Sequence, residues 1–214
     1  MDTLPAPLIV VRRALARWWS DWISLALVNV LWGAAWFTLI LGPPATFGAF
    51  ASINRVAHDQ SATLGEFFAG ARRYFLISYV WLALNVIMIG AMVAGFLFYT
   101  QLQALWAFLP LGISLLIGCL WIATQLYALP YLIEQDDRRL LVALRNGLFT
   151  ILASPGYMVV ITGVAAAVAV VSAVMVAPLF LGGLSLIALL ASCAVADRIQ
   201  AFRLRRGDAP SERQ

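Results

Sequence analysis

The sequence contains no lysine, one histidine and two cysteines, and only 11% of its 214 residues are charged. A soluble domain carries about 25% charged residues, so the chain is not an ordinary soluble enzyme. A single histidine is too few for the usual zinc and di-metal ligand sets. Cys119 and Cys193 stand inside apolar runs, where small thiols pack as hydrophobic residues. These scarcities argue against a disulfide-stabilised secreted module, and no metal or other cofactor is expected.

Long stretches lack Asp, Glu, Lys and Arg altogether, namely 22–54, 74–133 and 146–196. The mean hydropathy of the chain is +0.92. A helix needs about 20 apolar residues to cross a hydrocarbon core roughly 30 Å thick. The second and third runs are each long enough for two crossing helices, and the first for one with residues left over. The chain is therefore expected to be an integral membrane protein in contact with the lipid bilayer, and no remaining stretch is long enough for a separate nucleic-acid-binding domain.

The expected fold is an all-α polytopic membrane bundle that forms one domain over residues 1–202, followed by a polar tail at 203–214. Gly42, Pro43 and Pro44 are predicted to break the first apolar run, because proline lacks an amide hydrogen and has a fixed φ angle. The predicted elements are an interfacial helix at 6–20, a proline-broken helix or hairpin at 22–41 with 45–57, four long crossing helices at 74–99, 105–133, 157–176 and 178–202, and amphipathic connectors at 58–73 and 134–146.

The arginines determine the expected orientation, because positively charged loops stay on the cytoplasmic side of a bacterial membrane. All 14 basic residues are arginine. If residues 22–57 form a hairpin that enters and leaves on one face, all 14 are cytoplasmic, and we favour this arrangement. If residues 22–57 cross once instead, an external N-terminus leaves 11 arginines inside and 3 outside. Both arrangements predict a multi-pass protein with a cytoplasmic C-terminus.

Catalytic groups are scarce. The three apolar runs contain no His, Asp, Glu, Lys or Arg, so none holds an acid or base that could activate a nucleophile. An ion-coupled pump is also disfavoured, because such pumps use ionisable residues inside the bilayer. His58 and Asp59 stand in a connector, where a weak metal site with Glu66 is the alternative to a solvated polar segment. We therefore expect the protein not to be an enzyme.

A few polar residues inside the apolar runs are the candidates for a buried site: Asn29, Asn85 and Gln125. Each of them either holds neighbouring helices together by hydrogen bonds or lines a site for an uncharged solute. Of these residues, Asn29 and Asn85 are the two to test first. The Gly42, Pro43 and Pro44 segment is either a rigid turn or a functional hinge.

The two amphipathic connectors are candidate docking surfaces for another membrane protein. Their arginines and aromatic residues are the groups that such a surface would present. The candidate docking residues are Arg55, Phe67, Phe68, Arg72, Arg73, Arg138, Arg139 and Arg145. Small residues between Gly163 and Ala173 form a further face suited to close helix contact, either with a partner or within the bundle.

Several short motifs resemble the YesL-like bacterial membrane proteins, a family of unknown function. They are Asn29-Val30-Leu31-Trp32, Gly42-Pro43 with Ala45-Thr46, Ala49 and Arg55, Phe67-Phe68, and Arg72-Arg73-Tyr74-Phe75. They cover about a quarter of the chain. Because such proteins are often found beside carbohydrate uptake systems, the resemblance implies an accessory role in sugar import.

Two functional hypotheses follow. In the first, the protein is a non-catalytic accessory or scaffold component of a bacterial carbohydrate uptake system, with membrane transporter subunits as partners. In the second, it is a small stand-alone permease or membrane binding protein for an uncharged solute. A homo-oligomer is compatible with either hypothesis.

Overall fold

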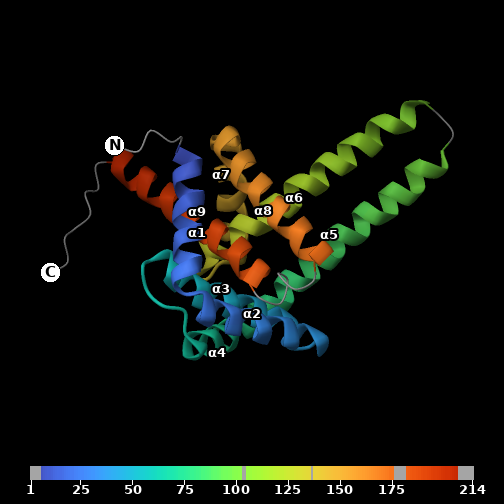
Figure 1. Ribbon diagram of the computed structural model, residues 1–214. Helices are drawn as coiled ribbons and strands as arrows, with labels where there is room; N and C mark the ends of the chain where they lie inside the picture. Colours follow the sequence, from blue (N-terminus) through green and yellow to red (C-terminus); the bar gives the residue numbers. More distant parts are fainter. Residues whose placement is uncertain (1–5, 103–104, 136, 176–181, 207–214) are drawn as a thin grey trace.

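The computed structural model describes residues 6–102, 105–135, 137–175 and 182–206 (Figure 1). Within these ranges all regular structure is helical, and no strand is present. The helices are α1 (Ala6–Ser20), α2 (Trp22–Phe37), α3 (Gly42–Ala57), α4 (Leu64–Arg73), α5 (Phe75–Gln101), the 3-10 helix η1 (Leu105–Ala107), α6 (Phe108–Glu134), α7 (Leu140–Ala153), α8 (Pro155–Met175) and α9 (Leu184–Arg206). The predicted all-α fold is confirmed.

Four of these helical segments are long and apolar enough to cross a membrane: α5, η1 with α6, α8 and α9. They correspond to the four long helices predicted from the sequence, with shifted ends. Helix α8 already begins at Pro155, and α9 continues to Arg206, so residues 203–206 are helical rather than part of a tail. The predicted start of the last helix at 178 and the tail residues 207–214 lie outside the described residues. The helical bundle fits an integral membrane protein.

The turn between α2 and α3 comes earlier in the sequence than the prolines suggested. Residues 38–41 form the turn, in which Leu39 has a positive φ of 56°. Gly42, Pro43 and Pro44 belong to the first turn of α3, so the predicted break at these three residues is corrected. Proline is accepted there because the first amide hydrogens of a helix have no intrahelical partner. Helix α3 has 16 residues and is therefore about 24 Å long.

Helices α2 and α3 form a hairpin whose two ends lie side by side. Asp21, which precedes α2, accepts a hydrogen bond on Oδ2 from the backbone amide of Ala62, which follows α3, at 2.7 Å. At the other end, the hydroxyl of Tyr79 on α5 donates to the carbonyl of Ile40 in the turn at 2.6 Å. Helices α2 and α3 therefore form a helical hairpin, and the side of a membrane on which its ends lie stays a prediction.

Helix α3 is the centre of the bundle. Each of its residues except Arg55 is buried, and it contacts α2, α4, α5, α6 and α9. Small residues make this possible, because Gly48 lies against the backbone of Phe67 and Gly70 lies against Ala51, which brings α3 and α4 into close contact. On the α5 side, the Phe47 ring packs 5.7 Å from the Trp81 ring, centroid to centroid.

Helices α5 and α6 form an arm that projects away from the other helices (Figure 1). The most apolar 18-residue stretch of α5 contains no residue that is buried inside the protein. Large side chains such as Ile87, Leu97 and Leu116 are more than half exposed. Each helix of the arm has 27 residues, or about 40 Å, which is enough to cross a hydrocarbon core with some tilt.

Candidate functional site

The ends of α1, α3, α6 and α9 meet in a region that we call the charged end, defined by Arg17, His58, Asp59, Glu134 and Arg203. Arg17 donates from Nε and Nη2 to the two carboxylate oxygens of Asp59, at 2.8 and 2.6 Å. Its Nη1 donates to the carbonyl of Ala57 at 2.7 Å. Such a paired guanidinium–carboxylate contact fixes direction as well as distance, so it orients α1 against the end of α3.

Glu134 joins α3 to the end of α6. Its Oε1 lies 2.6 Å from Nε2 of His58 and accepts a hydrogen bond from Nδ2 of Asn54 at 2.7 Å. His58 and Asp59 are neighbours in the sequence but bind different helices. Glu66 lies 3.8 Å from Arg73 instead, so the structure does not assemble the metal-site alternative. Among the described residues, no group of three His, Cys, Asp or Glu side chains could hold a metal ion.

The contact between His58 and Glu134 predicts a pH-dependent stability. The hydrogen bond to Glu134 is the largest of the effects that raise the pKa of His58 above its ordinary value. A raised pKa in the folded state means that the stabilisation is complete below the unfolded pKa of about 6.5 and is lost as the pH rises through the folded pKa. Because the His58 side chain is about half exposed, we expect a loss of about 0.5 to 1 kcal/mol between pH 6 and pH 9.

Thermal unfolding of the purified chain in an uncharged detergent, measured across this pH range, checks the prediction. The His58→Gln variant is the control, because its side chain does not titrate, and the loss should be absent from it. Identical pH profiles for the two proteins would contradict the assignment.

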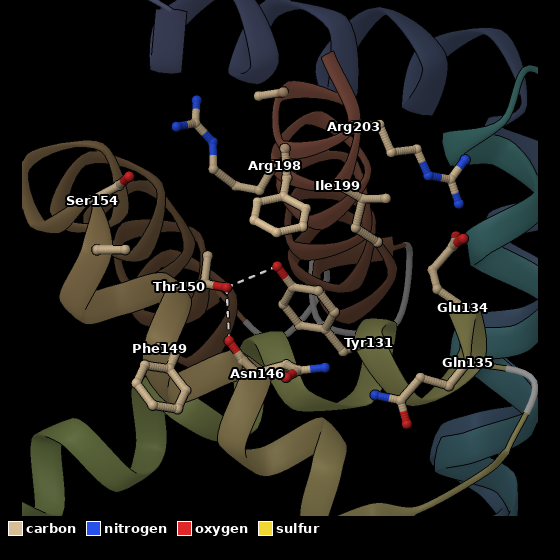
Figure 2. Close-up of a pocket in the computed structure, with 13 residues that line it drawn as sticks. Tyr131, Glu134, Gln135, Asn146, Phe149, Thr150, Ser154, Arg198, Ile199 and Arg203 are labelled. Atoms are coloured by element: carbon tan, nitrogen blue, oxygen red, sulfur yellow. Dashed lines mark hydrogen bonds between the residues drawn. The ribbon is translucent and has the colours of Figure 1, made fainter. Parts of the chain in front are cut away.

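A pocket of about 630 Å³ opens beside the charged end, between the end of α6, helix α7 and helix α9 (Figure 2). Ligand sites commonly have volumes in this range. The pocket is lined by Tyr131, Glu134, Gln135, Asn146, Phe149, Thr150, Ala153, Ser154, Arg198, Ile199, Ala201, Phe202 and Arg203.

One wall of this pocket is an ordered chain of polar groups (Figure 2). The Tyr131 and Thr150 hydroxyl oxygens lie 2.7 Å apart, and the Thr150 hydroxyl donates to the Asn146 carbonyl at 2.7 Å. On the facing helix, Arg198 donates to Asp197 at 2.9 Å and lies 3.8 Å above the centre of the Tyr157 ring. These contacts hold the walls in place before any ligand binds.

Two of the three predicted buried amides, Asn85 and Gln125, lie in the arm and join its two helices. The indole Nε1 of Trp81 donates to Gln125 Oε1 at 2.8 Å, and the indole Nε1 of Trp121 donates to Asn85 Oδ1 at 3.2 Å. Asn29 contacts α9 instead, because its Oδ1 accepts from the backbone amide of Ser185 at 3.1 Å. In these hydrogen bonds Asn29 joins α2 to α9, whereas Asn85 joins α5 to α6.

The predicted docking residues divide into buried and exposed groups. Phe67 is only 4% exposed and packs in the core, so the expectation that it lies on a docking surface does not hold. Phe68, on the same helix, is 60% exposed. Arg72, Arg73, Arg139 and Arg145 are exposed as well, although Arg73 pairs with Glu66 and Arg139 with Asp137. Arg55 is half-buried and donates to the Ser61 carbonyl.

The two predicted connectors come together in the structure. The guanidinium carbon of Arg138 lies 5.9 Å from the centre of the Tyr74 ring, within the range of a cation–π contact. Tyr74 follows α4 directly, so the exposed residues of α4 and the start of the α6–α7 connector lie close to one another. Their juxtaposition was not visible in the sequence.

The sequence reasoning missed the pocket. Its residues Arg198 and Arg203 come shortly after the charge-free run 146–196, and this position near the end of an apolar helix was the one available signal. Nothing in the sequence indicated that the end of α6 and helix α7 would face these arginines.

No family model, curated protein or solved structure matches the chain. The likeness of the Asn29–Phe75 stretch to the YesL-like proteins therefore stays a prediction.

Proposed function

We propose that the chain is a non-catalytic accessory or scaffold subunit of a bacterial plasma membrane, and that its α5–α6 arm packs against the spanning helices of a transporter. The observation that carries this proposal is the arm itself, because its far part projects away from the remaining helices (Figure 1) and the most apolar stretches of its two helices are only 0% and 11% buried. The resemblance to YesL-like proteins supports a carbohydrate uptake system as the partner.

The outer surface of α5 suits a protein neighbour. Ala83, Gly90 and Ala94 are exposed and recur at helical spacing, and a Cβ placed on Gly90 would meet no other atom within 4 Å. Small residues at such intervals allow helix backbones to approach closely, which is the main source of helix association in lipid. Contact with lipid alone places no such demand on side-chain size.

The test is crosslinking in cells, followed by gentle extraction and mass spectrometry of the proteins captured with the chain. We expect a transporter subunit, and we expect the Gly90→Leu variant to capture it several times less efficiently than the wild type. Val93→Leu is the matched control, because Val93 is an exposed and already bulky residue of the same helix. Capture of copies of this chain alone, or equal capture by both variants, would contradict the proposal.

The second candidate function, a stand-alone permease or membrane binding protein for an uncharged solute, is favoured by one observation. Nε2 of Gln125 is buried and has no hydrogen-bond partner among the described residues, so the amide and indole cluster retains one unused donor. Alanine at Asn85 and at Gln125 separates the two functions. Lost solute uptake with partner capture intact supports the permease, and intact uptake with lost capture supports the accessory subunit.

A further inference from the structure

One face of helix α4 is exposed, and Figure 1 shows this helix at the lower edge of the molecule. The opposite face is buried, because Phe67 and Gly70 pack on α3. On the exposed side, Leu64, Phe68 and Arg72 follow one another at intervals of four residues. Residues with this spacing are neighbours on a helix surface, so the three side chains form one row.

The exposed row leads directly into a helix that is able to cross a membrane. Tyr74 is the only residue between α4 and α5. Its amide donates to the Gly70 carbonyl at 3.0 Å, and its carbonyl accepts from the Ser78 amide at 2.9 Å, so the junction is ordered. Phe75 and Leu76, the first residues of α5, are also exposed, Leu76 to 77%.

The position of this junction relative to a bilayer follows from its charges. Arg72 and Arg73 are the last charged residues before the apolar run of α5, and charged side chains are costly inside a hydrocarbon core. Helix α5 is long enough to cross that core by itself. The end of α4 therefore lies at the membrane surface, where α5 enters the lipid.

Guanidinium groups outnumber carboxylates at this junction. Arg72 makes no side-chain hydrogen bond or ion pair within the described chain, and Arg73 lies 3.8 Å from Glu66. Arg138, from the connector between α6 and α7, adds a third guanidinium over the Tyr74 ring. Three arginines and one glutamate give the face a positive charge that is complementary to an anionic surface.

The composition of the face fits a lipid leaflet. Exposed aromatic and aliphatic side chains with arginines beside them are typical of a helix at a membrane surface. A leaflet surrounds the start of α5 at the same depth, so it covers Phe68 and Leu76 together. The neighbouring Arg139 and Asp137 pair with each other and leave the charge of the face unchanged.

We propose that the exposed face of α4 binds anionic phospholipids of the leaflet that α5 enters. Phe68 inserts between the headgroups, and Arg72, Arg73 and Arg138 bind the lipid phosphates. Arg72 is the principal contact, because no carboxylate of the described chain pairs with it. Clusters of basic residues beside a spanning helix attract such lipids. This binding does not depend on the proposed docking of the arm, which uses residues further along α5.

The first experiment locates the side chain at position 68 in the full chain. A Phe68→Cys, Cys119→Ala protein is labelled with the environment-sensitive fluorophore NBD, and the Cys119→Ala parent checks that the buried Cys193 does not react. In nanodiscs of equal amounts of phosphatidylcholine and phosphatidylglycerol, we expect a shift of the emission to shorter wavelength and quenching by lipids spin-labelled near the headgroup. A label at Ser61, an exposed residue before α4, should be quenched several times less.

The second experiment measures lipid preference. Native mass spectrometry gives the ratio of phosphatidylglycerol to phosphatidylcholine that the unlabelled chain retains from the same mixed bilayer. Arg72→Gln should lower this ratio about fivefold, the factor expected for one arginine near an anionic surface. Arg72→Lys keeps the charge and is the matched control. Both variants should unfold at the wild-type temperature in phosphatidylcholine alone, because Arg72 has no side-chain partner in the described chain.

The proposal requires both results. It is overturned if the label at position 68 stays in water, or if its emission shifts without quenching by the spin-labelled lipids, which would indicate a covering protein. It is also overturned if Arg72→Gln retains phosphatidylglycerol as well as Arg72→Lys does.

Discussion

Replacement of Gly48 by alanine is expected to destabilise the protein by about 3 kcal/mol, even though alanine is the better helix former by about 1 kcal/mol. A Cβ at Gly48 would lie 2.3 Å from the carbonyl oxygen of Phe67 and 3.1 Å from the Cβ of Ala71. The first obstacle is backbone, so no side-chain rotation relieves it. Helices α3 and α4 would have to separate, and the core around α3 would lose its contacts.

The measurement is the thermal unfolding midpoint of the purified chain in a mild detergent, together with the fraction that elutes as one species. Gly65→Ala is the matched control, because Gly65 lies on α4 and a Cβ there meets nothing within 4 Å. The same chemical change should leave stability unchanged or slightly improve it at Gly65. A Gly48→Ala protein as stable as the wild type would show that α3 and α4 are not in close contact.

Replacement of Thr46 by valine is expected to cost about 2 to 4 kcal/mol, although the two side chains have nearly the same shape. The Thr46 hydroxyl accepts from the indole Nε1 of Trp32 at 2.9 Å and from that of Trp36 at 3.2 Å, and it donates to the Gly42 carbonyl at 3.0 Å. Valine leaves both indole donors without this acceptor, and Trp32 is buried. The α2–α3 hairpin would lose the hydrogen bonds that join its two helices.

Thermal unfolding and tryptophan emission of the Thr46→Val and Thr46→Ser variants test this. Serine keeps the hydroxyl and removes one methyl group, so it should cost about 0.8 kcal/mol. A valine variant at least as stable as the serine variant would mean that packing at this position outweighs the hydrogen bonds.

Much of the fold could be predicted from local composition. The four long apolar helices were expected at positions close to those found, because the length of a charge-free run and the thickness of a bilayer are sufficient to identify them. The ends were less accurate where proline was involved. Pro43 and Pro44 were interpreted as breaks, yet each lies in the first turn of a helix, where its missing amide hydrogen has no cost.

The candidate sites were less predictable. The helices of the arm are apolar on all sides, so their sequence does not distinguish a face toward lipid from a face toward protein. Phe67 and Phe68 are identical neighbours, and only the packing of α4 on α3 decides that the first is buried and the second exposed. The partners of Asn29, Asn85 and Gln125 depended in the same way on which helices become neighbours.

The sequence by itself determined that this is an α-helical protein with four segments able to cross a membrane, because both properties depend on the composition of single segments. Only the tertiary structure decided that α3 is the buried centre of the bundle and that the arm stands apart. It also gathered the end of α6, helix α7 and helix α9 around one pocket. These features arise from contacts between residues far apart in the chain, and such contacts are set by how whole helices pack together rather than by the pattern within any one of them.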